Sequence, residues 1–288
     1  MALPHTTLDL TSARRLLVAG DLHGHLDRLK DALEAIGYDA AASDQLVLLG
    51  DLLDRGPDVL EVDDWLIANP SVIHILGNHD DMLIASVGLA KMDERNNPHT
   101  LLTNGGDWLL DFAPGFERTS QGAGDLMAAL ITAEEEGSLY DRASLIDLRI
   151  VEFAKRMSES PVAMTVRTPR GRRVALTHAD VPFPTWAETV DALMSDNARE
   201  AHQARIGCNW MRTLFNRMMR VRPYGSEALA QLDIGIPDVD HVFLGHSIVD
   251  EPVTAANLTW LDTGPHKGGP ITVLDVDTWL DQMKIAAE

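Results

Sequence analysis

The sequence predicts an α/β protein whose polar residues gather at one edge of a sheet. Three apolar, β-rich runs each end in a glycine, at Gly20, Gly50 and Gly77, and each glycine is followed at once by acids, histidines or an amide. Segments with helical spacing lie between the runs, so strand and helix alternate through residue 90. Open α/β sheets bind ligands at the carboxyl edge of their strands, which is where we expect the site.

The first ninety residues supply the clearest elements. The predicted strands are Leu16–Ala19, Leu46–Leu49 and Val72–Leu76. The predicted helices are His25–Ile36, Asp58–Ala68 and Met82–Ala90. The first of these helices has leucine or isoleucine at positions 26, 29, 33 and 36, which places one apolar stripe along one face.

The remainder predicts helical segments placed between further strands. Residues 117–160 and roughly 187–220 have mostly helical patterns. A hairpin is predicted where two apolar runs flank Pro169-Arg170-Gly171. The predicted strands are Val162–Val166, Arg173–Thr177, His241–Leu244, Leu258–Leu261 and Ile271–Val276. With no internal repeat or linker, we expect one domain over residues 1–288 with helical insertions near 117–160 and 187–233.

Composition limits the classes of function. A chain of 288 residues that is 45% hydrophobic can bury one large core. The net charge of −20 argues against nucleic-acid partners, which need a basic surface. The lone Cys208 excludes a disulfide framework, and neither a signal peptide nor a run of membrane-spanning length is found. We therefore expect a cytoplasmic protein with no membrane partner.

The residues after the three glycines have the chemistry of metal ligands. The strings read GDLHG from Gly20, GDLLDRG from Gly50 and GNHD from Gly77. Two later histidines also follow directly on predicted strands. Carboxylate, imidazole and amide groups together suit oxygen-preferring or borderline divalent metals. The predicted ligands are Asp21, His23, Asp51, Asn78, His178 and His246.

Six such positions can hold two cations. We assign Asp21 and His23 to one cation and Asn78, His178 and His246 to the other. Asp51 would bridge the two, because one carboxylate can serve metals about 3.5–4 Å apart. Such a pair lowers the pKa of a bridging water toward neutrality and provides hydroxide. The pattern predicts a metal-assisted phosphoester hydrolase.

The motifs also resemble those of a known family. D-x-H, then G-D-x-x-D-R-G, then G-N-H-[DE] and two later histidines form the signature of the calcineurin-type metallophosphoesterases. Among these, the chain most resembles the bacteriophage-lambda-type and related bacterial serine/threonine protein phosphatases, from Leu16 to about Val276. The resemblance implies a four-layer αββα sandwich with two mixed sheets and helical insertions. It implies two divalent metal ions. Manganese is the expected metal, and the same ligands would also accept iron, zinc or cobalt.

The resemblance also assigns roles to individual residues. The six predicted ligands match the metal ligands of the family. His79 matches the acid that protonates the leaving group, Asp54 its partner, and Arg55 a residue that contacts phosphate. Arg212, in a more variable region, matches a second phosphate arginine, and Asn78 also belongs to the substrate-binding set. The implied reaction is hydrolysis of a phosphoprotein or a small phosphoester by the bridging hydroxide.

Two alternatives remain open. A diadenosine tetraphosphate hydrolase of the same superfamily shares most ligands, but its members usually carry a non-acidic residue at the position of Asp54. A non-enzymatic scaffold that had lost its metal is the other alternative. It would have no need for intact ligands, whereas every ligand position is intact here. A nuclease or phosphodiesterase would normally have histidine where Ile248 stands. Asp54 thus favours the protein-phosphatase branch.

Other histidines are expected to be structural or unremarkable surface residues. His74, inside an apolar strand, is interpreted as a core or edge residue. The others that fit no part of the constellation are His5, His25, His99, His202, His241 and His266.

Overall fold

The computed structural model describes residues 4–135 and 139–287. Its centre is a pair of sheets. The larger sheet has the strand order β1-β5-β6-β7-β9-β8, and the smaller has the order β10-β2-β3-β4. Both contain parallel and antiparallel neighbours: β6 is antiparallel to β5 but parallel to β7, and β2 is antiparallel to β10 but parallel to β3. The predicted pair of mixed sheets is confirmed.

The strand bounds are as follows. The larger sheet contains β1 (His5–Asp9), β5 (Ala163–Arg167), β6 (Arg173–Thr177), β7 (His241–Leu244), β8 (Val253–Ala255) and β9 (Leu258–Trp260). The smaller sheet contains β2 (Arg15–Ala19), β3 (Asp44–Leu48), β4 (Ile73–His74) and β10 (Val273–Asp275).

Apolar side chains join the sheets into a sandwich. Leu16 and Val18 of β2 pack in one buried cluster with Leu176 of β6 and Phe243 of β7. Leu17, which points to the other face of β2, belongs to a second cluster on the helix side. Both faces of β2 are therefore buried, which explains why its sequence is a continuous apolar run rather than an alternating one.

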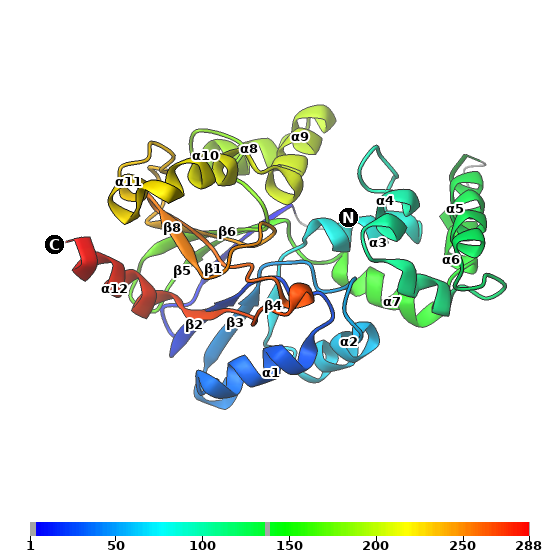
Figure 1. The fold of residues 1–288 in the computed structure, drawn as a ribbon, viewed down its shortest axis with the longest axis horizontal. Helices are drawn as coiled ribbons and strands as arrows, with labels where there is room; N and C mark the ends of the chain where they lie inside the picture. Colours follow the sequence, from blue (N-terminus) through cyan, green and yellow to red (C-terminus); the bar gives the residue numbers. More distant parts are fainter. Residues whose placement is uncertain (1–3, 136–138, 288) are drawn as a thin grey trace.

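Helices cover the outer faces of both sheets. Figure 1 shows α1 and α2 against the smaller sheet, and α8 to α11 against the larger. The first group is α1 (Leu26–Ala35) and α2 (Val59–Ala68). The second is α8 (Trp186–Leu193), α9 (Ala198–Trp210), α10 (Thr213–Val221) and α11 (Ser226–Ala230). The order helix, sheet, sheet, helix is the predicted four-layer sandwich.

A further group of helices extends beside the sandwich (Figure 1). Its members are α3 (Asn78–Ser86), α4 (Pro98–Thr103), α5 (Ser120–Glu135), α6 (Leu139–Ser144) and α7 (Leu148–Met157). Leu126 and Phe153, from α5 and α7, join the same core cluster as Leu29 of α1. The expected helices of 117–160 are present, although residues 136–138 lie outside the described part of the chain. The C-terminal helix α12 (Val276–Ala287) contributes Val276 and Leu280 to the core between the sheets.

Several boundaries differ from the sequence prediction. The strand expected at 72–76 pairs only through Ile73–His74, and β1 and β8 were not predicted. Strand β1 is a half-exposed strand at the edge of its sheet without an apolar run, so periodicity could not reveal it. Helix α3 begins at Asn78 instead of Met82, because Asp80 Oδ2 accepts a hydrogen bond from Gly77 N at 2.8 Å and caps a polar first turn.

Within the described residues, we find no helix that combines the length and apolar character needed to span a membrane.

Candidate metal centre

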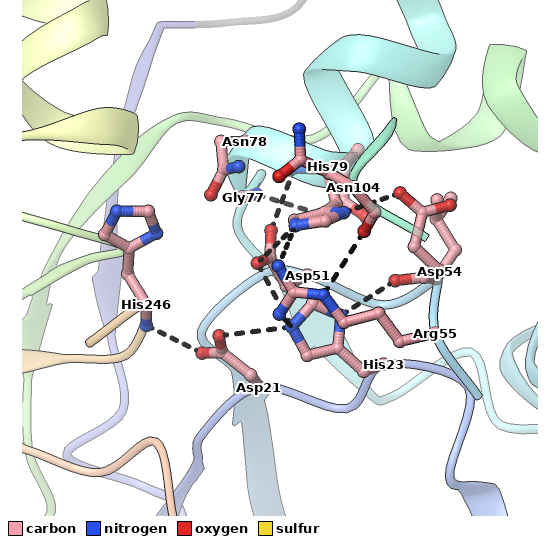
Figure 2. Close-up of polar contacts among 12 residues, drawn as sticks. Asp21, His23, Asp51, Asp54, Arg55, Gly77, Asn78, His79, Asn104 and His246 are labelled. Carbon is pink, nitrogen blue, oxygen red and sulfur yellow. Dashed lines mark hydrogen bonds and ion pairs between the residues drawn. The ribbon is translucent and has the colours of Figure 1, made fainter. Parts of the chain in front are cut away.

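The carboxyl ends of strands from both sheets converge on one buried site. Asp21 and His23 follow β2, Asp51 follows β3, His178 follows β6 and His246 follows β7. Figure 2 shows Asp21, His23 and Asp51 close together, with His246 beside Asp21. This is the edge at which the sequence predicted a site.

Two glycines allow the segments to approach this closely. A Cβ on Gly77 would lie 2.2 Å from Asp51 Oδ1, and a Cβ on Gly245 would lie 2.3 Å from Asp21 Oδ1. Both distances are far below van der Waals contact, so neither position tolerates a side chain. Close packing against Asp51 and Asp21 therefore explains why glycine stands at positions 77 and 245.

Backbone strain is concentrated in the same place. Among the described residues other than glycine, positive φ angles occur at seven positions, and five of them belong to the predicted site. These five are His23, Asp51, Asp54, Arg55 and His246. Such conformations cost about 1–3 kcal/mol each and persist where the surrounding structure enforces them, typically at functional sites.

Asp51 lies at the centre of the cluster. Its Oδ2 is 3.5 Å from His23 Nε2, and its Oδ1 is 3.3 Å from His178 Nε2. Two groups of three possible metal-binding side chains share Asp51: one with His23 and His79, the other with His178 and His246. Within each group the possible ligand atoms lie within 4.8 Å of one another. Asp51 thus occupies the position expected of a bridging carboxylate.

The histidines are oriented by backbone carbonyls. His23 Nδ1 lies 3.0 Å from Leu53 O, and His178 Nδ1 lies 2.7 Å from Leu49 O. A carbonyl only accepts, so Nδ1 carries the proton in each ring and Nε2 is directed at Asp51. Hydrogen bonds of this kind fix the orientation of metal-binding histidines.

His246 has the opposite orientation. Its Nε2 lies 3.3 Å from the carbonyl of Trp210, which leaves Nδ1 as the nitrogen free to bind. Its ring packs edge-on against that of His178, with the centroids 5.0 Å apart. Asn78 completes this side of the cluster, with its Oδ1 3.2 Å from His178 Nε2.

Asp21 supports the presence of a cation. Its Oδ1 accepts a hydrogen bond of 2.8 Å from His246 N, whereas its buried Oδ2 has no hydrogen-bond partner. That free oxygen lies 3.8 Å from His23 Nε2. An unpaired buried carboxylate oxygen is costly, and a metal ion would satisfy it. The donor set of aspartate, histidine and asparagine fits a divalent transition metal.

The pKa values of the buried acids and histidines also indicate that the site favours a cation. Burial raises the pKa of Asp21, and the neighbouring Asp262 raises it further. Burial alone would lower the pKa of His178, but Asp51 and Asp21 raise it to about 10. Burial lowers the pKa of His23 and keeps that ring neutral. The closely spaced acids therefore favour positive charge at this site, which a bound cation would supply.

A second constellation lies directly beside the cluster. His79 Nδ1 is 2.5 Å from Asp54 Oδ2, and the other oxygen of Asp54 accepts a hydrogen bond of 2.6 Å from Trp108 Nε1. Burial raises the pKa of Asp54, while its hydrogen bonds to His79 and Trp108 oppose that rise. Arg55 reaches across the centre and donates to His79 Nε2 at 2.8 Å and to His23 Nε2 at 2.7 Å. Figure 2 shows Asp54, His79, Arg55 and His23 in contact.

Above the cluster a cavity of about 610 Å³ opens to solvent. Its lining residues are Arg55, Thr103, Asn104, Gly105, Arg212, His246, Ile248, His266 and Lys267. Arg212 Nη2 lies 3.4 Å from the carbonyl of His246. Arg212 does not continue a helix, because α9 ends at Trp210 and α10 begins at Thr213. The break directs the Arg212 side chain toward the cavity.

His266, which fitted no part of the predicted constellation, lies beside it in the structure. Its ring centroid is 4.8 Å from that of His23, and its Nε2 is 3.5 Å from Arg55 Nη1. The string Asp262-Thr263-Gly264 immediately before it was the available signal. By contrast, His241 is a structural residue, since its ring is buried and contacts Thr259 Oγ1 at 2.7 Å.

Comparisons with known proteins place the chain in a family. The family model described as "Calcineurin-like phosphoesterase" matches residues 14–250. "Serine/threonine-protein phosphatase 1" of Salmonella typhimurium is 26% identical over 90% of this chain and 91% of its own length. "Bis(5'-nucleosyl)-tetraphosphatase, symmetrical" of Pseudomonas fluorescens is 27% identical over 90% of each chain. A solved cold-active protein-tyrosine phosphatase of a Shewanella species is 16% identical, covers 96% of this chain and 78% of its own, and has a TM-score of 0.49. The family match covers most of the chain, so this protein belongs to the calcineurin-like phosphoesterases, a family of metal-dependent hydrolases.

Proposed function

We propose that this protein is a serine/threonine protein phosphatase that hydrolyses phosphomonoesters with two divalent metal ions. The buried pair of His79 and Asp54, beside the Asp51 cluster, is the observation that carries the proposal. Such a pair supplies a proton to a poor leaving group, which a serine or threonine alkoxide is. The similarity to the Salmonella phosphatase over nine-tenths of both chains supports it.

The metal ligands in this proposal are those expected from the sequence. Asp21 and His23 would hold one cation, Asn78, His178 and His246 would hold the other, and Asp51 would serve both. Bound cations would activate a water as nucleophile and neutralise charge on the phosphoryl group. We propose manganese as the working metal, since Asp, His and Asn ligands suit it; iron, zinc and cobalt also fit this donor set.

The arginines at the cavity bind the phosphoryl group. Arg55 already lies between His23 and His79 and presents two guanidinium nitrogens toward the cluster. Arg212 lines the same cavity, and Asn78 belongs to the metal cluster, with its Oδ1 3.2 Å from His178 Nε2. A guanidinium can hold two phosphoryl oxygens at once, which stabilises charge as it develops in the transition state.

His79 moves the proton. Because its Nδ1–H is directed at Asp54, its Nε2 is the nitrogen that contacts Arg55, which lines the cavity. When Arg55 binds phosphoryl oxygens it releases this nitrogen, which takes up a proton from solvent. The ring can then donate that proton to the leaving oxygen. Asp54 holds the ring in place and stabilises its charge, and Trp108 in turn holds Asp54.

A symmetrical bis(5'-nucleosyl)-tetraphosphatase is the second candidate, favoured by the similarity to the Pseudomonas relative. The lining of the cavity supports the protein phosphatase, because none of its nine residues is Phe, Tyr or Trp, the side chains on which bases commonly stack. A scaffold without metal is a third reading, which analysis of bound metal in the purified protein tests.

One experiment decides between the two activities. We would measure kcat/KM with manganese for a phosphoserine peptide, a phosphotyrosine peptide and diadenosine tetraphosphate under identical conditions. The proposal expects the phosphoserine peptide to be the best of the three. A tenfold preference for diadenosine tetraphosphate would contradict it.

A further inference from the structure

The cavity above the metal centre is more basic than the rest of the chain. The protein has 44 acidic and 24 basic residues apart from histidine. The nine residues that line the cavity nevertheless include Arg55, Arg212 and Lys267 and no aspartate or glutamate. Positive charge concentrated at one opening of an acidic protein attracts anionic ligands locally.

This basic lining exceeds what one phosphoryl group requires. The proposed function uses Arg55 and Arg212 for the phosphoryl oxygens. This leaves without a task the positive charge of Lys267 and the ring of His266, which can donate a hydrogen bond. His266 Nε2 lies 3.5 Å from Arg55 Nη1, so this ring is beside the guanidinium that would bind the phosphoryl group, and Lys267 lines the same cavity. A cavity of about 610 Å³ also has room for groups that flank the phosphoryl group.

The loop that carries His266 and Lys267 is held in one conformation. Arg28 of α1 donates to Pro265 O at 2.9 Å and to Gly269 O at 2.5 Å, so one guanidinium ties both sides of the loop. Gly269 N also donates to Gly264 O at 3.0 Å. A Cβ on Gly269 would lie 1.8 Å from the carbonyl oxygen of Thr263, so only glycine fits there. A loop ordered in advance binds a ligand at a smaller entropic cost.

We propose that His266 and Lys267, on the loop 264–269, bind a second anionic group on the substrate, next to the phosphoryl group that is hydrolysed. The inference rests on the proposed function and narrows it to phosphopeptides that carry an acidic side chain beside the phosphoserine or phosphothreonine. The polar lining, in which Ile248 is the apolar side chain, suits a peptide with charged neighbours better than a nucleobase. Arg28 acts as a positioning residue.

Two phosphoserine peptides that differ only in charge test the proposal. One has aspartate on each side of the phosphoserine, and the other has asparagine. We expect the wild-type protein to have a kcat/KM about fivefold higher for the aspartate peptide, the upper end for one charge pair at an exposed site. Lys267→Gln and His266→Asn should each bring this ratio to within about twofold of one. Lys30→Gln, which removes the same charge from an exposed position on α1 outside the cavity, should keep the fivefold ratio.

Arg28→Gln tests the positioning role separately. It should lower the aspartate-to-asparagine ratio although Arg28 is not among the residues that line the cavity. A ratio near one in the wild-type protein would overturn the inference, and so would a ratio that survives in both loop variants.

A failure of the proposed function can be told apart from a failure of this inference. If neither peptide is hydrolysed, the protein-phosphatase proposal is wrong. The two peptides are then compared as inhibitors of p-nitrophenyl phosphate hydrolysis. Tighter inhibition by the aspartate peptide that Lys267→Gln abolishes supports the loop, whereas equal inhibition by both peptides overturns it.

Discussion

Asp54 and His79 form a buried pair in which the carboxylate Oδ2 lies 2.5 Å from the imidazole Nδ1. Trp108 fixes the other oxygen of Asp54 at 2.6 Å, so the carboxylate has no freedom to turn away. His79 Nε2 is also 3.9 Å from Asp51 Oδ2, close enough to compete for a role in holding metal. The geometry alone therefore allows His79 two roles, and mutagenesis separates them.

His79→Asn should keep both metals and lose turnover. We expect kcat to fall by about 10²–10⁴, the usual contribution of general acid catalysis. The loss should be smaller for p-nitrophenyl phosphate than for phenyl phosphate, because a good leaving group needs little protonation. Elemental analysis and steady-state rates on both esters check this. Loss of metal, or an equal deficit on both esters, would contradict the role of acid.

Asp51→Asn should remove metal as well as activity. The amide keeps the shape of the side chain but loses the negative charge and one of two ligating oxygens, and Asp51 is shared by both groups of possible ligands. We expect metal content and p-nitrophenyl phosphate hydrolysis to fall together, the latter by at least 100-fold, a loss of about 2.7 kcal/mol in transition-state stabilisation. Asp64→Asn, at an exposed position, is the control. Near wild-type hydrolysis by the Asp51 variant would show the two-metal interpretation to be wrong.

Arg212→Ala should lower kcat/KM by at least tenfold, about 1.4 kcal/mol. Arg212→Lys should restore activity only in part, because lysine cannot hold two oxygens in a fork. Arg199→Ala is a suitable control, since Arg199 is exposed and its side chain does not line the cavity. Arg205→Ala is not, because Arg205 forms an ion pair with the buried Asp81 of α3. If the Arg212 and Arg199 variants are equally active, the second phosphate contact lies elsewhere.

Asp44 should make the free energy of unfolding depend on pH in the acidic range. Burial alone would raise the pKa of Asp44, but hydrogen bonds from Arg15 and Arg14 outweigh burial and hold the pKa well below its usual 3.8. A folded pKa below the unfolded one stabilises the protein above about pH 4 and loses that effect as the pH falls further. Asp44→Asn should lower the free energy of unfolding at pH 7 by about 1–3 kcal/mol.

Urea unfolding of the wild-type protein and the Asp44→Asn variant at pH 7, 5 and 3 measures this effect. The difference between the two proteins should shrink at pH 3, because the wild-type carboxyl is then partly protonated in the unfolded state. A difference that stays constant across the series would show that the ion pair is not its source.

The local sequence determined the fold class and the positions of the six proposed ligands. A run such as Leu16–Ala19 can only be buried, and the glycine and polar residues that follow must emerge at the end of the strand. Because each proposed ligand lies within a few residues of a strand end, strand pairing brings the ligands together (Figure 2). Patterns of burial and short-range spacing are therefore sufficient for this part of the site.

The tertiary structure decided what periodicity does not encode. The break at Arg212 and the placement of His266 depend on segments without a repeating pattern. Arg212, His266 and Arg55 line one cavity, and no local sequence motif specifies it. Arg28 and Pro265 meet although they are 237 positions apart in the sequence. Which nitrogen of each histidine is free depends on distant carbonyls, such as Leu49 for His178. Such contacts arise from the packing of whole elements. Local sequence patterns therefore predict the positions of the proposed ligands but not the residues that line the cavity.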